Sequence, residues 1–223
     1  MVYFLHPDAG KARLHVKGED FKYLIKVRRH RVGDELGFRN KEDIKTLHRY
    51  KLTAIEPRNA VFEHISSEVF EVKAKKELHV AWCVIESKSV EKVLAGLNEI
   101  GVAKISFIYC DRSQKNFKPD FKRYERILEA SNQQCGRTQM MGFATCKNIE
   151  SFIEEYPDTK VFDFTQKILG CENDFETVLI GCEGGFSQKE KEFLKKQERF
   201  RLDTPMVLRS ESAVVAVASK ILL

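Results

Sequence analysis

The residues best suited to chemistry lie between Ile180 and Ala213, near the carboxy terminus. A short apolar run, TVLI, leads there into a loop with three glycines, Gly181, Gly184 and Gly185. Glycine lets a backbone turn sharply or approach a ligand closely. Such loops also occur for packing alone, and this one lacks the GxGxxG and GxxxxGK[ST] spacings of the phosphate-binding motifs. The loop by itself indicates either a ligand site or a tight turn.

Arg209 and Glu211 precede a run of small apolar residues that predicts a helix to the end of the chain. A guanidinium donates two parallel hydrogen bonds to an anion, and a carboxylate can accept a proton. One interpretation is therefore catalysis on a group that becomes negatively charged. The other is structural, because a glutamate in a first helical turn is stabilised by the helix dipole, with Arg209 as its surface partner. The two residues alone leave both interpretations open.

An alternating series of strands and helices has to position these residues. Residues 78–85 form a continuous apolar run, which is typical of a strand buried on both faces. Ser187 and Glu190 have the spacing of a capping box, which begins a helix. Strand–helix alternation predicts a parallel sheet covered on both faces, with ligands beyond the carboxyl ends of its strands. The other predicted strands are 104–110, 141–145, 160–164 and 177–181, and the other predicted helices are 89–100, 119–135 and 149–156.

The first third of the chain has a different rhythm. Its short β-like stretches RLHV, ELGF, YKLTAI and AVFEHI are separated by turn-prone residues, which favours a compact barrel. Residues 20–27 are predicted to form a short helix. The boundary is expected in the polar stretch 71–77, so we predict two domains, residues 1–72 and residues 73–223.

Positive charge is concentrated in the first third. Residues 1–76 hold 17 Lys and Arg against 11 Asp and Glu, whereas the remaining residues hold 21 against 22. The densest patch is KVRRHR, residues 26–31. A basic patch can release counterions from a phosphate backbone, which makes nucleic acid a plausible partner. The alternative is a solvated strand edge that resists aggregation.

Cysteine and histidine usage indicates neither a metal site nor a disulfide framework. The six cysteines are far apart, no pair has CxxC spacing, and the six histidines make no HExxH arrangement. We therefore expect no metal, and unpaired cysteines of the kind found in a reducing cytosol. The amino terminus has no basic-then-apolar signal region, and the longest apolar runs are too short to span a bilayer. We expect a cytoplasmic protein without a membrane partner.

Several motifs, in order along nearly the whole chain, resemble one family. IGCEGGFSQKE (180–190) is similar to the IGPEGG-F-S-x-x-E signature of the RsmE family, the ribosomal RNA uridine N3-methyltransferases of the SPOUT class. VLRSESA (207–213) resembles its ILR-T-E-T-A segment, and NQQCGR (132–137) its E-Q-s/c-G-R element. IKVRRHRVGDEL (25–36) and EIGV (99–102) resemble two further elements of the family.

The resemblance implies a fold that periodicity does not reveal. It implies a small PUA-like β-barrel that binds RNA, followed by a SPOUT α/β domain with a deep trefoil knot at the carboxy terminus. Chains are generally unknotted, so the knot is expected only because of the resemblance. The resemblance also implies a homodimer, S-adenosylmethionine as the methyl donor, and N3 of a specific uridine in 16S ribosomal RNA of the small subunit as the acceptor.

Site residues carry over from the matching motifs. Arg209 and Glu211 become the catalytic candidates, Arg209 by stabilising negative charge on the uracil and Glu211 by accepting a proton or orienting Arg209. The cofactor-binding candidates are Phe164, Ile180, Gly181, Glu183, Gly184, Gly185, Leu202, Val207, Leu208, Ser210 and Ala213. The RNA-binding candidates are Lys26, Arg28, Arg29, Arg31, Arg112, Ser113, Gln134 and Arg137.

The chain departs from the family pattern at several positions. Cys182 replaces a proline, Thr204-Pro205-Met206 replaces a G-x-R element, and Gln133 replaces a glutamate. Two alternatives therefore accompany the methyltransferase interpretation. One is an RNA-binding ribosome-assembly factor with a degenerate cofactor pocket, and the other is a SPOUT methyltransferase that acts on transfer RNA.

Overall fold

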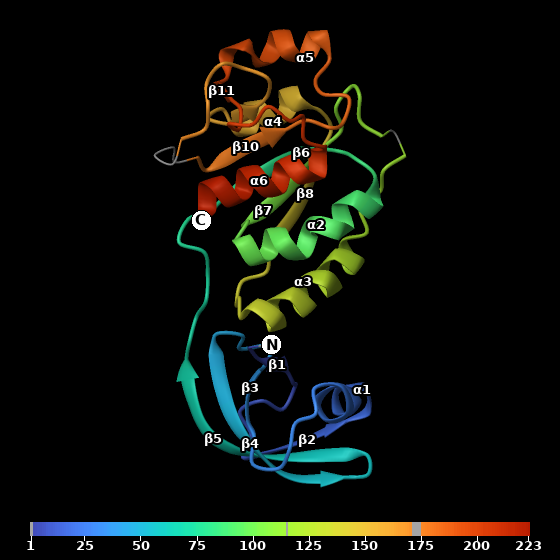
Figure 1. The fold of residues 1–223 in the computed structure, drawn as a ribbon, viewed down its shortest axis with the longest axis vertical. Coiled ribbons are helices and arrows are strands. Elements are labelled where there is room, and N and C mark those ends of the chain that lie inside the picture. Colours follow the sequence, from blue (N-terminus) through green and yellow to red (C-terminus); the bar gives the residue numbers. More distant parts are fainter. Residues whose placement is uncertain (1, 115, 171–174) are drawn as a thin grey trace. The chain divides into compact units, whose positions relative to one another are not determined.

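The computed structural model describes residues 2–114, 116–170 and 175–223. The chain forms two compact units (Figure 1). The first holds the residues up to Lys73 together with Asn132–Gln139, and the second holds Ala74–Ser131 and Met140–Leu223. The first division lies close to the expected boundary, but the inclusion of 132–139 in the first unit was not predicted.

The first unit contains a curled five-stranded sheet. Its order is β1-β3-β4-β5-β2, antiparallel except where β1 pairs with β3. Residues alternate between buried and exposed along β2, so one face packs on a core around Phe38, Tyr50 and Phe62. The strands are β1 (Phe4–Leu5), β2 (Arg13–Lys17), β3 (Glu35–Arg39), β4 (Thr46–Glu56) and β5 (Asn59–Val69).

The predicted helix of the first unit is a short α-helix that widens into a π-helix. α1 (Gly18–Phe21) runs directly into η1 (Lys22–Val27), and the amide of Arg28 donates to the carbonyl of Tyr23 at 2.8 Å. Single π turns inside helices often accompany functional sites. The basic patch begins inside this π-helix.

The second unit contains the parallel sheet that the strand–helix alternation predicted. Its order is β11-β9-β10-β6-β7-β8, and every pairing is parallel. Its two central strands, β10 and β6, are continuous apolar runs because both of their faces are buried. The strands are β6 (His79–Cys83), β7 (Lys104–Ile108), β8 (Gly142–Cys146), β9 (Lys160–Phe162), β10 (Thr177–Ile180) and β11 (Arg199–Phe200).

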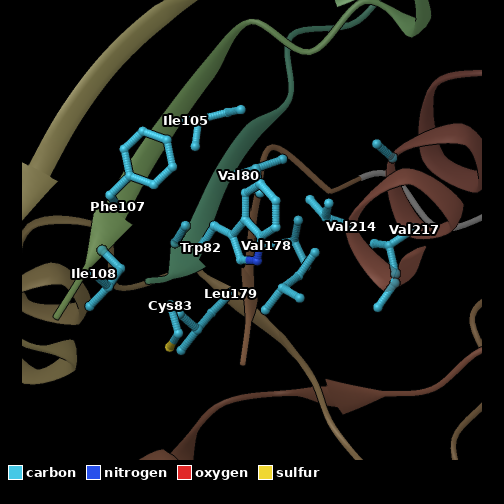
Figure 2. Close-up of a cluster of buried hydrophobic side chains, with 14 of the residues drawn as sticks. Val80, Trp82, Cys83, Ile105, Phe107, Ile108, Val178, Leu179, Val214 and Val217 are labelled. Carbon is cyan, nitrogen blue, oxygen red and sulfur yellow. The ribbon is translucent and has the colours of Figure 1, made fainter. Parts of the chain in front are cut away.

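Five α-helices accompany this sheet in the described part of the second unit. α6 packs against α2 and β10, and Val214 and Val217 of α6 lie in the same core as Trp82 and Leu179 (Figure 2). α2 ends at Gly101, whose φ of 112° is the left-handed conformation that a glycine adopts without strain. The helices are α2 (Ser87–Ile100), α3 (Phe121–Cys135), α4 (Ile149–Glu155), α5 (Gln188–Phe193) and α6 (Ser210–Leu222).

The expectation that all cysteines are unpaired is wrong for one pair. Cys83, at the end of β6, forms a disulfide with Cys110, which follows β7. The two strands are neighbours in the sheet, so their carboxyl ends come together and bring these two cysteines, 27 residues apart in sequence, within bonding distance. Cysteine spacing does not reveal such a pair, because the sheet register creates it. The described free cysteines are Cys135, Cys146 and Cys182, and Cys171 lies outside the described residues.

Candidate functional site

A cavity of about 260 Å³ lies where β9 and β10 end. Its walls come from the segment after β9, the loop after β10 and the segment that leads from β11 into α6. We call residues 181–187 the glycine loop. The cavity brings together every residue that the resemblance assigned to the cofactor: Phe164, Ile180, Gly181, Glu183, Gly184, Gly185, Leu202, Val207, Leu208, Ser210 and Ala213.

The glycine loop is a tight turn closed by its own backbone. The amide of Gly185 donates to the carbonyl of Cys182 at 2.9 Å, and Gly185 has a φ of 62°, which disfavours any residue with a β-carbon. The predicted capping box then begins α5. Ser187 accepts from the amide of Glu190, and Glu190 accepts from the amide of Ser187. Burial raises the pKa of the Cys182 thiol, so this residue stays neutral where the family has a proline.

A buried hydrogen-bond chain joins the glycine loop to α6. The indole N–H of Trp82 donates to the hydroxyl of Ser210 at 2.8 Å, and this hydroxyl donates to the carbonyl of Gly181 at 2.6 Å. Trp82 is fully buried among Val178, Leu179 and the core side chains around them (Figure 2). Nothing in the sequence singles out Trp82, because a tryptophan in an apolar strand is ordinarily a core residue.

Arg209 and Glu211 stand beside the cavity and do not pair with each other. Arg209 is the N-cap residue of α6, between the two lining residues Leu208 and Ser210, and its side chain is exposed. Among the described residues, no ion pair or hydrogen bond engages the guanidinium of Arg209 or the carboxylate of Glu211. The surface pair of Arg209 with Glu211 is therefore not formed, although Glu211 does lie in the first turn of α6, as the structural interpretation expected. The idea that Glu211 orients Arg209 likewise has no contact to support it.

Eight lining residues of the cavity were not predicted. Charges of both signs are among them, since Asp163 faces the cavity from one wall and Lys191 and Arg201 from others. Thr204 and Met206, which depart from the family pattern, also line it, and the hydroxyl of Thr204 accepts from the amide of Met206 at 3.2 Å. The eight are Phe162, Asp163, Cys182, Phe186, Lys191, Arg201, Thr204 and Met206. For Asp163 the sequence did offer a signal, because a charged residue there directly follows the apolar strand that contains Val161.

The predicted RNA residues Arg112 and Ser113 lie in a loop after β7, residues 110–114, which we call the arginine loop. Arg112 donates from Nη1 to the carbonyl of Gly184 at 2.7 Å, so it stands directly on the glycine loop. The hydroxyl of Ser113 accepts from the amide of Cys110 at 3.0 Å, which closes a local turn. The structure thus places Arg112 beside the cavity and gives Ser113 a role within its own loop.

The remaining predicted RNA residues belong to the first unit. Lys26, Arg28, Arg29 and Arg31 are all exposed, and Arg28 lies 3.4 Å from the side-chain oxygen of Gln134. Arg29 has a φ of 61°, an uncommon conformation for a residue other than glycine, asparagine or aspartate. Arg137 is different, because its side chain is buried and burial lowers the pKa of its guanidinium. It does not share the exposed surface of Arg28 and Gln134.

The cavity suits S-adenosylmethionine on chemical grounds. Apolar side chains such as Ile180 and Leu202 offer a surface for an aromatic base, and the glycine loop brings backbone amides and carbonyls close without intervening side chains. Charged groups of both signs at the same cavity match the amino and carboxylate groups of a methionine moiety. No group of three or more His, Cys, Asp or Glu suited to hold a metal ion occurs among the described residues. No helix in the described ranges is both long and apolar enough to cross a membrane.

Comparison with known proteins identifies the family. Residues 72–222 match the RNA methyltransferase domain family. The chain is 38% identical over 223 residues to the ribosomal RNA small subunit methyltransferase E of Helicobacter pylori (strain ATCC 700392 / 26695), with 98% of each chain covered. It is 25% identical over 192 residues to the protein of the same name from Aquifex aeolicus (strain VF5), which covers 80% of this chain and 84% of that protein.

A solved structure supports the fold. Ribosomal RNA small subunit methyltransferase E from Neisseria gonorrhoeae, bound to S-adenosylmethionine, superposes with a TM-score of 0.73 at 16% identity, covering 98% of this chain and 95% of that one. The predicted fold class, a parallel α/β domain of the SPOUT type with a barrel-like domain, is confirmed. The match over nearly the full length shows that this chain belongs to the ribosomal RNA small subunit methyltransferase E family, the RsmE family of RNA methyltransferases.

Proposed function

We propose that this enzyme transfers the methyl group of S-adenosylmethionine to N3 of a specific uridine in 16S ribosomal RNA of the small subunit. Family membership supports the enzyme class and the methyl donor. The observation that carries the finer proposal is the cavity together with an exposed Arg209 at its rim, whose guanidinium no described residue engages. A cation placed there can meet an acceptor that becomes anionic during the reaction.

The cavity holds the methyl donor through backbone as much as through side chains. Ile180, Leu202 and Leu208 would pack against the adenosine, and residues 181–185 would bind through backbone amides and carbonyls. Bound there, S-adenosylmethionine supplies a methyl group on a positively charged sulfur. The protein's own task is to hold the acceptor in line with that methyl, since orientation removes much of the entropic cost of a two-molecule reaction.

Arg209 stabilises the acceptor ring. Uracil N3 carries a proton and becomes a good nucleophile only once that proton has left. The lost proton leaves negative charge on the two carbonyl oxygens, and a guanidinium can donate parallel hydrogen bonds to such an anion. Because Arg209 is not held in an ion pair by Glu211, its donors are available to the substrate. Glu211, in the first turn of α6, is the candidate to accept the N3 proton.

The first unit binds the ribosomal RNA backbone. Lys26, Arg28, Arg29 and Arg31 are exposed together after a π-helical turn, and Gln134 extends their surface. These side chains would neutralise phosphates, which positions the RNA without reading its sequence. The predicted domain roles, an RNA-binding barrel and a catalytic α/β domain, follow from this division of charge.

We also propose that the enzyme works as a cytoplasmic homodimer that needs no metal. Large apolar side chains are exposed around the cavity, with Phe164, Met206 and Val207 among them. Clustered apolar exposure marks an interaction surface, and a second copy of the chain would cover it beside each cavity. The trefoil knot is likewise part of the proposal. It requires the glycine loop and the segment entering α6 to lie against each other, as they do at Gly181 and Ser210.

Methyl transfer to purified RNA tests the proposal. Small ribosomal subunits from a strain that lacks its own enzyme would be incubated with the protein and labelled S-adenosylmethionine, in parallel with transfer RNA. Label in the small-subunit RNA is the expected result. Label in transfer RNA alone would assign the enzyme to the other SPOUT substrate class. Absence of both methyl transfer and cofactor binding by calorimetry would support an assembly factor with a degenerate pocket.

A further inference from the structure

Glu190 is a buried carboxylate that joins two loops. Its side chain lies in the first turn of α5 and is only 3% exposed. One carboxylate oxygen accepts from the amide of Ser187 at 2.7 Å, and the other accepts from the amide of Asp111 at 2.9 Å. A capping box explains the bond to Ser187 but not the bond to Asp111, which lies 79 residues away in the arginine loop.

Ser187 strengthens the same junction. Its hydroxyl accepts from the amide of Glu190 at 3.2 Å and donates to the carboxylate of Asp111 at 2.6 Å. Hydrogen bonds to a charged partner are the stronger kind, and a buried carboxylate is costly unless it accepts them. The backbone and the side chain of Asp111 are thus both fixed to the start of α5.

Arg112, the next residue, is thereby placed on the glycine loop. Its Nη1 donates to the carbonyl of Gly184 at 2.7 Å. A β-carbon at position 184 would lie 3.2 Å from Cβ and 3.3 Å from Cδ of Arg112, so the side chain packs there only because residue 184 is glycine. A guanidinium has five N–H donors. The exposed side chain of Arg112 therefore keeps donors for a phosphate while it holds the Gly184 carbonyl.

We propose that Glu190 is a positioning residue that holds Arg112 between the cofactor cavity and the ribosomal RNA, and so couples binding of the cofactor to binding of the RNA. This inference rests on the proposed function. Ligand in the cavity fixes the glycine loop and with it the partner carbonyl of Arg112. The fixed Arg112 then presents its remaining donors to the RNA. Coupling of this kind is reciprocal, so bound RNA must tighten cofactor binding by the same factor.

The Glu190→Gln variant tests the coupling with almost no change in size. A glutamine has one acceptor oxygen, so one of the two backbone amides loses its partner. We would measure the affinity of the protein for small ribosomal subunits with and without saturating S-adenosylhomocysteine. The wild-type protein is expected to bind subunits at least fivefold more tightly with the ligand, and this ratio should fall toward one in the variant. KM for subunits should rise about tenfold, while affinity for S-adenosylhomocysteine alone stays within twofold.

Glu192→Gln is the matched control. Glu192 lies on the same helix, is exposed and, among the residues that the structure describes, pairs only with Lys195. The Glu192→Gln variant should leave the coupling ratio, kcat and the KM for subunits unchanged. If Glu190→Gln instead lowers subunit affinity equally with and without S-adenosylhomocysteine, Glu190 is only a helix cap and the proposal is wrong.

A double variant separates positioning from general destabilisation. If Glu190 acts through Arg112, adding Glu190→Gln to Arg112→Ala should raise KM for subunits no further than Arg112→Ala does alone. Effects that multiply would contradict the proposal.

The methyl-transfer assay on the wild-type protein distinguishes failure of the proposed function from failure of the coupling. If wild-type protein methylates no RNA, the proposed function fails. If it does and Glu190→Gln matches it in every readout, only the coupling fails.

Discussion

The indole N–H of Trp82 donates to the hydroxyl of Ser210 across 2.8 Å, inside the core of the second unit. This one contact links the central strand β6 to the start of α6, residues 128 apart in sequence. The same hydroxyl donates to the carbonyl of Gly181, so the wall of the cavity depends on a buried serine. We therefore expect binding of the cofactor and stability of the fold to depend on this same residue.

The Ser210→Ala variant should lose both cofactor affinity and stability of the fold. Removing the hydroxyl leaves the buried Trp82 N–H without its acceptor and the Gly181 carbonyl without its donor, which costs about 1–3 kcal/mol of unfolding free energy. Urea denaturation and calorimetry with S-adenosylmethionine measure the two effects. Ser212→Ala, an exposed position on the same helix, should change neither. Unchanged cofactor affinity in Ser210→Ala would show that the Gly181 carbonyl needs no support.

The Arg209→Ala variant should lose turnover and keep the cofactor. Removal of one donor to a developing anion costs on the order of 100-fold in kcat. Because the side chain is exposed and unengaged in the described residues, the fold should not suffer. Single-turnover methyl transfer and calorimetry provide the readouts. Near-normal turnover in a well-folded Arg209→Ala protein would remove Arg209 from the mechanism.

Glu211 is tested by the turnover of the Glu211→Gln variant. If its carboxylate accepts the uridine proton, Glu211→Gln should lower kcat by about 100-fold or more and leave cofactor affinity intact. A variant that keeps the wild-type kcat would restrict Glu211 to the electrostatics of the first turn of α6.

The basic patch should control RNA binding alone. Replacing Arg28 and Arg31 by alanine and Arg29 by glycine should weaken binding to small subunits and reduce the salt slope by about one unit per lost phosphate contact. Glycine is chosen at position 29 because Arg29 has a φ of 61°, a conformation that would strain an alanine. Affinity for S-adenosylmethionine should not change. An equal loss of RNA and cofactor binding would contradict separate roles for the two units.

Acid should destabilise the second unit through His79. Burial, with a contribution from nearby Lys104, lowers the pKa of His79 from 6.5 to about 4, and its Nε2 lies 2.8 Å from the hydroxyl of Ser106. Between pH 6.5 and 4, His79 is protonated in the unfolded chain and neutral in the folded chain. The contribution of neutral His79 to the free energy of unfolding is therefore complete above pH 6.5 and is lost as the pH falls toward 4. It amounts to about 1–3 kcal/mol.

Denaturation in urea at a series of pH values measures this loss. His79→Gln should flatten the dependence between pH 6.5 and 4, whereas His15→Gln, an exposed position on β2, should leave it as in the wild type. If the slope survives in His79→Gln, other groups titrate in this window and His79 is not responsible.

Local sequence signals predicted most of the fold. The apolar run at 78–85, the helical pattern at 89–100 and the Ser187–Glu190 capping box each depend on neighbours along the chain, and the structure confirms all three. Family resemblance supplied the list of cavity residues, which the fold brings together. Neither source could reveal Cys83–Cys110 or Asp111–Glu190, because both contacts arise from sheet register and loop placement.

The placement of Arg137 shows the same limit at a candidate site residue. Its motif, NQQCGR, predicted an RNA contact, but residues 132–139 belong to the first unit and the guanidinium is buried. The hydroxyl of Tyr3 donates to its backbone carbonyl at 2.9 Å. A motif records that a residue matters to a family without saying whether it binds substrate or supports the fold.

Mapping the modified nucleoside tests the central claim most directly. Small subunits without the modification would be treated with the protein and S-adenosylmethionine that carries a deuterated methyl group, and their RNA digested and analysed by mass spectrometry. We predict one labelled nucleoside, N3-methyluridine, at a single position of 16S ribosomal RNA, and labelling that is on the order of 100-fold slower with Arg209→Ala. Label on another base, on ribose or at many positions would contradict the account.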